Sequence, residues 1–126
     1  MQGTILFGHG SRSADYAQPF FRIRAAMLNQ SPGSKIEIGF LELTSPPLES
    51  AIEALQGAGV TSVVVIPIFF GPGRHVLKDL PERIGHVLDR HPDLVVDIAP
   101  CVGEAPAVIE AMAAYAMQCG QEASQS

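Results

Sequence analysis

The sequence lacks any apolar run long enough to cross a membrane. Its longest apolar stretch, Val63–Phe70, is interrupted by Pro67, whereas a membrane-spanning helix needs about 20 residues. The start of the chain carries neither a basic leader nor a small-residue cleavage site, the marks of a secretory signal. We therefore expect no membrane partner and a cytoplasmic location.

Basic residues, tryptophan and cysteine are also scarce. The 126 residues include eight Lys and Arg against 13 Asp and Glu, no Trp and two Tyr, with a formal charge of −5. A nucleic-acid-binding surface needs clustered positive charge and stacking rings, so we expect no nucleic-acid partner. Cys101 and Cys119 are too far apart for a Cys-x-x-Cys pair, and we interpret both as reduced, structural thiols.

What the sequence does have is an alternation of strand-like and helix-like segments. Short β-branched or aromatic runs lie near residues 3–7, 35–41, 60–70 and 94–99, and a helical pattern follows each. This alternation predicts a parallel sheet with right-handed crossovers and helices on both faces, for which the compact strand order is 2-1-3-4. We predict one flavodoxin-like, three-layer α/β domain over residues 1–120 and a disordered tail at residues 121–126.

The helical patterns show apolar stripes at helical spacing. The first three stripes are Tyr16-Phe20-Ile23-Met27, Leu48-Ala51-Ile52-Leu55 and Leu80-Ile84-Val87-Leu88. Ser13 or Asp15 is expected to cap the first helix, Pro47 to begin the second and Asp79 to cap the third. A fourth helix is expected from about residue 105 to residue 119.

Two histidines directly follow strand-like runs. His9 lies in Gly8-His9-Gly10-Ser11, and His75 ends Gly71-Pro72-Gly73-Arg74-His75. In the strand order 2-1-3-4 the switch point lies between the first and third strands, so these two loops face each other across a crevice. The loop after the second strand contributes Glu42. Two imidazoles and a carboxylate with open positions suit a divalent transition metal, although a lone strand-end histidine is more often structural.

Other polar residues near these loops have two interpretations. Arg12, Arg74 and Lys78 could hold the carboxylates of a substrate, or they could be ordinary solvated loop charges. Gly10 and Ser11 are the remaining residues expected to contact a substrate. His86 and His91, by contrast, fall among charged residues of the third helix, and we interpret them as part of a solvated face. The helix dipole favours a protonated histidine at a helix C-terminus, and this effect is a sufficient structural explanation for His91 at that position.

Two other kinds of site fit the sequence poorly. The Gly8–Ser11 loop matches neither the dinucleotide-binding fingerprint nor a Walker A sequence, so a phosphate loop is a weak interpretation. A metallohydrolase would use open metal positions to activate water, yet His-Glu-x-x-His is missing from the sequence.

Three motifs, in this order, resemble those of a known family. They are Gly8-His9-Gly10-Ser11, Phe40-Leu41-Glu42 and His75-x-x-x-Asp79-Leu80-Pro81. They are similar to the short-form sirohydrochlorin chelatases, the CbiX-type class II chelatases, over nearly the whole chain. The segment Leu43–Pro47 departs from the Ala-x-Pro-Ser type of sequence that is more usual in the family.

The resemblance implies a half-chelatase fold and a lyase-type activity. The reaction would be insertion of a divalent metal, typically cobalt, into sirohydrochlorin in cobalamin biosynthesis, with iron or nickel insertion into a related tetrapyrrole as an alternative. A non-catalytic carrier of metal or tetrapyrrole would use the same ligands, and it is the main alternative from another class. By resemblance His9 and His75 are metal ligands that share proton removal, and Glu42 is the third ligand. The metal is then a substrate, no permanently bound cofactor is implied, and two protomers form a homodimer around the macrocycle.

Overall fold

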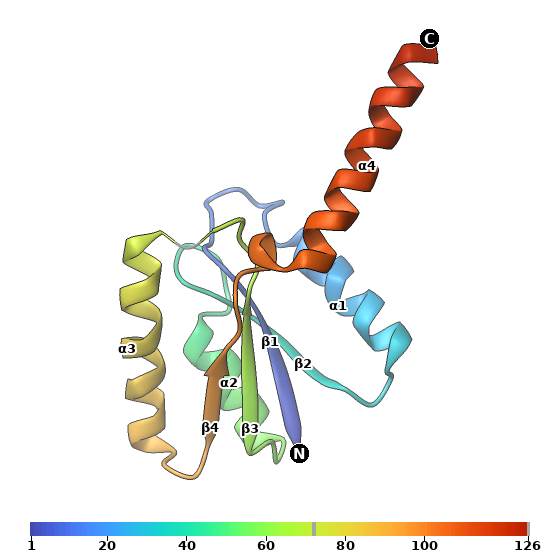
Figure 1. Cartoon of the computed structure of the whole chain (residues 1–126). Helices are drawn as coiled ribbons and strands as arrows, with labels where there is room; N and C mark the ends of the chain where they lie inside the picture. Colours follow the sequence, from blue (N-terminus) through green and yellow to red (C-terminus); the bar gives the residue numbers. More distant parts are fainter. Residues whose placement is uncertain (72, 126) are drawn as a thin grey trace.

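The structure, a computed structural model, describes residues 1–71 and 73–125, apart from the side chains of His75, Leu77 and Gln125. The strands are β1 (Gln2–Gly8), β2 (Lys35–Phe40), β3 (Ser62–Pro67) and β4 (Val95–Ile98). The helices are α1 (Gln18–Gln30), α2 (Leu48–Gly57), α3 (Arg74–Arg90) and α4 (Pro106–Gln125), with the short 3-10 turn η1 (Val102–Glu104) before α4. The strands pair in parallel in the order β2-β1-β3-β4 (Figure 1), which confirms the predicted fold class.

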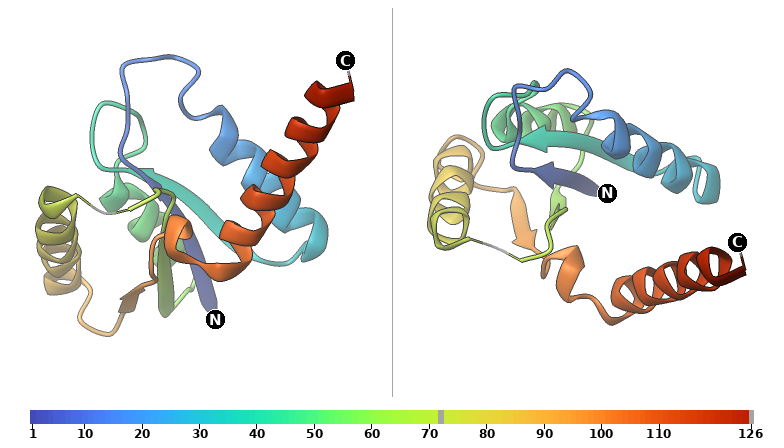
Figure 2. Two further views of the ribbon diagram at one scale, coloured as in Figure 1. Left: turned by 45° about the horizontal axis from the view of Figure 1, so that its top comes forward. Right: turned by 90° about the horizontal axis from the view of Figure 1, so that it is seen from above.

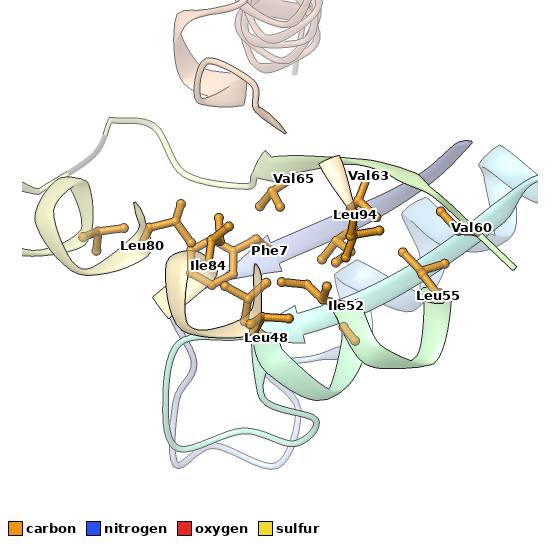
Figure 3. Close-up of a cluster of buried hydrophobic side chains, with 14 residues drawn as sticks. Phe7, Leu48, Ile52, Leu55, Val60, Val63, Val65, Leu80, Ile84 and Leu94 are labelled. Carbon is orange, nitrogen blue, oxygen red and sulfur yellow. The ribbon is translucent and has the colours of Figure 1, made fainter. Parts of the chain in front are cut away.

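Two apolar clusters hold the helices against opposite faces of the sheet. On one face, Phe7 and Val65 of the strands pack with the stripes of α2 and α3, including Leu48, Ile52 and Val87 (Figure 3). On the other face, Phe20 of α1 packs against the ring of Phe40, with ring centroids 5.1 Å apart. The predicted apolar stripes are confirmed, because residues of each lie in these clusters.

Two predicted helix starts are wrong. α1 begins at Gln18 after Ala17, and the backbone carbonyls of Ser13 and Asp15 accept hydrogen bonds within turns instead of their side chains capping the helix. α3 begins at Arg74 rather than at Asp79. The reason is Val76, which is buried and extends the apolar stripe of α3 by one turn toward the N-terminus,.

Two further boundaries also differ from the prediction. β3 ends at Pro67, and the exposed Phe70 lies in the bend after the strand. α4 continues to Gln125, so residues 121–125 are helical and do not form the expected tail. The polar residues there suit a solvent-exposed helix as well as a coil, which is why composition misled the prediction. α4 projects away from the sheet at the edge where the strands end (Figures 1 and 2).

Cys101 is buried, as expected of a structural thiol, whereas Cys119 is exposed on α4, and both are free thiols. Burial raises the pKa of the Cys101 thiol, and the nearby Glu104 carboxylate raises it further, so Cys101 stays protonated at neutral pH. Within the described residues, no helix combines the length and the apolar character that crossing a bilayer requires.

The buried cluster makes a direct prediction about stability. Replacing Phe7, which is fully buried, by Ala should lower the free energy of unfolding by about 3–5 kcal/mol, because the ring loses its apolar surroundings and leaves a cavity,. The matched change Phe21→Ala, at a half-exposed position of α1, should cost less than about 1 kcal/mol. Urea unfolding of both variants measures the difference, and equal losses would contradict this description of the core.

Candidate metal centre

Backbone pairing beyond the strands brings His9 and Glu42 together. The N–H of Leu41 donates to the carbonyl of Gly8 (3.0 Å), and the N–H of Glu42 donates to the carbonyl of His9 (3.1 Å). The first bond follows the register of β1 and β2, in which Gly8 pairs with Phe40, and the second, from the next residue, joins the two loops just beyond the strands. As a result His9 Nε2 lies 3.2 Å from Glu42 Oε1, and both side chains are about half exposed, at 49% and 56%.

Gly10 permits this close approach of the two loops. Its φ of 102° lies in a region that favours glycine,. A Cβ built on Gly10 would overlap the backbone carbonyl oxygen of Glu42. A side chain at position 10 would therefore push the loop carrying His9 away from the loop carrying Glu42. The structure thus gives Gly10 a packing role at the site.

Thr44 and Leu43 fix the loop that carries Glu42. The Ser11 N–H donates to Thr44 Oγ1, and that hydroxyl donates to the Ser11 carbonyl, both at 2.9 Å. The Thr44 N–H donates to the Glu42 carbonyl (2.7 Å), across Leu43 with a φ of 65°. This is a γ-turn with positive φ, a strained conformation. The backbone around Glu42 is therefore held on both sides.

Arg83 ties the end of β2 to two helices. From α3, its guanidinium donates Nη1 to the Leu41 carbonyl (2.6 Å) and donates Nε and Nη2 to the Glu49 carboxylate of α2 (2.7 and 2.5 Å). The hydrogen bond from Arg83 lowers the pKa of Glu49, against the opposing effect of burial. The Glu49 carboxylate in turn raises the pKa of Arg83, and the charges of Asp79 and Glu42 contribute. The cation of Arg83 thus also attracts Glu42.

The third predicted ligand, His75, belongs to the first turn of α3, so it lies on a helix and not in the expected loop. Its side chain lies outside the described residues, and its part in the site stays a prediction. Among the side chains that the structure describes, no group of three His, Cys, Asp or Glu residues could hold a metal ion. The described part of the site is therefore the pair His9 and Glu42.

The other predicted site residues lie on the same edge of the sheet or close to it. Arg12 is exposed in the loop after β1, whereas Arg74 and Lys78 are exposed on α3 rather than in a loop. Beside α3, a cavity of about 320 Å³ is lined by Val76, Leu80 and residues 98–101, among others. The mostly apolar residues that line this cavity include side chains of α3, the helix that also carries Arg74 and Lys78.

His86 and His91 have the structural character expected of them. His86 is exposed on α3. His91 is the C-cap of α3, and its Nε2 lies 3.5 Å from Glu53 Oε2. Both lie away from the loops that carry His9 and Glu42, toward the opposite end of α3.

Sequence reasoning missed Arg83, Glu49 and Thr44. One signal for Arg83 was available, because it lies three residues after Leu80 and next to Ile84, at the margin of the buried stripe of α3. An arginine at such a position buries its stem and needs a partner for its head group. The sequence carries no comparable signal for Glu49 or Thr44, whose partners lie more than 30 residues away.

Together, the parallel sheet and its strand-end His–Glu pair define a half-chelatase type of α/β domain, and comparison with known proteins gives the family. The CbiX family model matches residues 3–118. The chain therefore belongs to the CbiX family.

Curated relatives are similar over part of their length. A sirohydrochlorin cobaltochelatase of Methanococcoides burtonii is 34% identical over 80 residues, which are 64% of this chain and 61% of the relative. One of Methanopyrus kandleri is 32% identical over 85 residues, 68% of this chain and 59% of the relative. The chain thus matches about three-fifths of the length of these relatives.

Solved structures share the fold. A CbiX protein of Marinobacter aquaeolei VT8, with a proposed role in cobalamin (vitamin B12) biosynthesis, has a TM-score of 0.83 and 25% identity, with full coverage of both chains. SirB of Bacillus subtilis with Fe3+ has a TM-score of 0.75 and 29% identity, covering 87% of this chain and 44% of SirB. The sirohydrochlorin chelatase SirB in complex with cobalt has a TM-score of 0.66 and 27% identity, covering 80% of this chain and 43% of SirB.

The tight packing at Gly10 predicts a specific loss. Gly10→Ala should separate the two loops and lower the free energy of unfolding by more than the roughly 1–3 kcal/mol of backbone strain alone. Gly33→Ala is the matched control, because a Cβ there meets no atom within 4 Å. Urea unfolding measures both. A Gly10→Ala protein as stable as the control would contradict the packing role.

The Arg83–Glu49 pair predicts a pH dependence of stability. The pKa of Glu49 is lowered in the folded state. Its ionised carboxylate therefore stabilises the fold at pH values above the pKa of a glutamate in the unfolded chain, about 4.3. This contribution is lost as the pH falls through the lower, folded value. The difference in unfolding free energy between the wild type and Glu49→Gln should therefore be largest near pH 7 and shrink below about pH 4.

Urea titrations at a series of pH values measure this difference. Glu110→Gln, at an exposed position of α4, should give a difference that is small throughout. If the effect of Glu49→Gln were the same at pH 3 and pH 7, the ion pair would not be its cause.

Proposed function

We propose that the chain inserts a divalent metal, with cobalt as the favoured ion, into sirohydrochlorin. The observation that carries the proposal is the His9–Glu42 pair, 3.2 Å apart at the end of β1 and β2, in a chain of the CbiX family. An imidazole and a carboxylate are ligands for divalent transition metals. The names of the curated relatives, sirohydrochlorin cobaltochelatases, support the same activity.

The proposed reaction exchanges two protons for one metal ion. The divalent ion binds to the macrocycle nitrogens, and the two pyrrole protons leave, so the charge balances. His9, Glu42 and His75 hold the ion first, and the imidazole nitrogens that release it to the macrocycle then accept the departing protons, for which an imidazole suits neutral pH. The half-exposed positions of His9 and Glu42 leave room for the ion to pass on to the macrocycle, because an enclosed site would retain it.

The substrate and the metal are recognised by different residues in this proposal. The exposed cations Arg12, Arg74 and Lys78 bind carboxylates of the macrocycle, and Gly10 and Ser11 contact it from the first loop. Cobalt is favoured because the SirB chelatase was solved in complex with cobalt. SirB was also solved with Fe3+, which supports iron as the second candidate metal. No resident cofactor is part of the proposal, since the metal is a substrate.

The homodimer suggested by the family resemblance is part of the proposal. One chain offers a single edge of a sheet, with His9 and Glu42 open to solvent, and a macrocycle needs a second wall. The match to less than half of the length of SirB supports two copies acting together. Full activity in a monomer would contradict this part of the proposal.

An anaerobic insertion assay tests the function. Purified protein is mixed with sirohydrochlorin and Co2+, and the absorbance change of insertion is followed beside a protein-free control. The wild type should accelerate insertion, and His9→Ala or His75→Ala should lower the rate at least 10²-fold, a loss of about the size expected for acid–base groups. His86→Ala is the matched control, because His86 is an exposed histidine on the same helix as His75.

Calorimetric titration with Co2+ on the same proteins separates an enzyme from a carrier. Loss of cobalt binding together with loss of insertion in His9→Ala would support the proposed ligands. If the wild type bound cobalt but insertion proceeded at the background rate, the chain would be a carrier and the proposal would be wrong. Unchanged binding in both histidine variants would remove the ligand assignment.

A further inference from the structure

α4 has an apolar face that its own chain leaves uncovered. Residues 113–124 are exposed, and Glu110 and Glu122 are the charged residues of the helix. At 100° per residue, Val108, Met112, Tyr115, Ala116 and Cys119 share one side, which we call the α4 stripe. Val108 and Met112, at the base of the stripe, are half-buried beside the end of β3. The rest of the stripe continues into solvent, with Tyr115 69% exposed.

Within the described residues, half of one face of the sheet, over β3 and β4, has no helix lying across it. α2 and α3 cover one face, and α1 packs on the other over β1 and β2. On that second face, the register places Val64 and Ile66 of β3 beside Val95 and Asp97 of β4. Ile66 also packs against the cluster under α1. We call Val64, Ile66 and Val95 the open face, which has the exposed carboxylate of Asp97 at its β4 edge. Val95 is 54% exposed there. In Figures 1 and 2, α4 rises away from these strands instead of lying across them.

The direction of α4 is set by the turn before it. The N–H of Gly103 in η1 donates to the Phe69 carbonyl (2.9 Å). A Cβ built on Gly103 would overlap the backbone of Phe70, so η1 is pressed directly against the chain that leaves β3. The N–H of Ala105 donates to the Val102 carbonyl (3.1 Å), which closes the turn. These contacts hold η1, and with it the start of α4, against the segment that follows β3.

We propose that the α4 stripe of one copy covers the open face of a second copy, and that the exchange is reciprocal. A βα repeat has one helix per strand to cover its sheet, so the natural cover for the open face is an α4. The chain's own α4 is directed away, and the α4 of a second copy has the same stripe. A two-fold axis makes both contacts at once. The proposal specifies the contact within the homodimer and does not depend on the proposed reaction.

The α4 contact supplies most of the area that a stable dimer needs. The exposed residues 113–124 form about 18 Å of helix at 1.5 Å per residue, and a helix about 10 Å wide covers about 180 Å² over that length. Two such contacts, counted on both partners, bury about 720 Å², against the roughly 1,000 Å² of a specific interface. An isolated helix is also only marginally stable in water and gains stability by packing its apolar face. The exchange therefore stabilises α4 and also covers the open face.

Light scattering on the full chain, with matched variants of α4, tests the exchange. The wild type should have twice the single-chain mass of 13.4 kDa. Ala116→Glu places a charge in the α4 stripe and should give the single-chain mass. Ala114→Glu is the same change on the other side of the helix, and it should stay dimeric. Both alanines are exposed within one chain, so circular dichroism should show the same folded protein in each.

A variant of the open face distinguishes helix exchange from other contacts. Val95→Glu should also give the single-chain mass, whereas pairing of one α4 with another would leave this variant dimeric and overturn the proposal. Amide hydrogen exchange of residues 113–124 should be slow in the wild type and at least tenfold faster in Ala116→Glu. A monomeric wild type, or a dimer that survives Ala116→Glu, would also overturn it. Because none of these readouts involves sirohydrochlorin, failure of the proposed reaction would leave them unchanged.

Discussion

The candidate site depends on the continuation of backbone pairing beyond β1 and β2. Two further hydrogen bonds join the loops after the last strand residues, so His9 and Glu42 lie beside each other just beyond the strands. Such pairing requires the two backbones to approach as closely as neighbouring strands do, about 4.8 Å. Gly10 allows that approach where a side chain would overlap Glu42. The side-chain geometry thus follows from backbone geometry, which a rigid sheet holds in place.

Around this pairing, side chains from distant segments add support. Thr44 closes the two loops over each other, and Arg83 holds the Leu41 carbonyl from α3 while it pairs with Glu49 of α2. Arg83 and Glu49 are each about a quarter to a third exposed, so their pair is shielded from solvent more than a surface ion pair. The helix that carries His75 is thereby linked to the strand end that precedes Glu42. A movement of α3 would therefore displace both His75 and the loop that carries Glu42.

The sequence was informative where structure is determined locally. The strand order followed from short β-branched runs that alternate with helical stripes, and the neighbourhood of His9 and Glu42 followed from the rule that strand ends of a parallel sheet share one edge. The start of α3 was missed because glycines 71 and 73 resemble a loop, while Val76 alone does not reveal an extra turn. Arg83 and Thr44 depend on partners far along the chain, which no local pattern encodes. The direction of α4 depends on the contact between Gly103 and Phe70, and is equally non-local.

The exposed apolar side of α4 has a consequence for how the protein behaves on dilution. Tyr115 is 69% exposed in a single chain, so water contacts a surface that a packed helix would hide. When such a surface is covered by a second molecule, mass action makes the folded population grow with protein concentration. The thermal midpoint would then rise with concentration, whereas that of a self-sufficient domain is constant. A cell that makes little of this protein would hold it largely as single chains with a frayed α4.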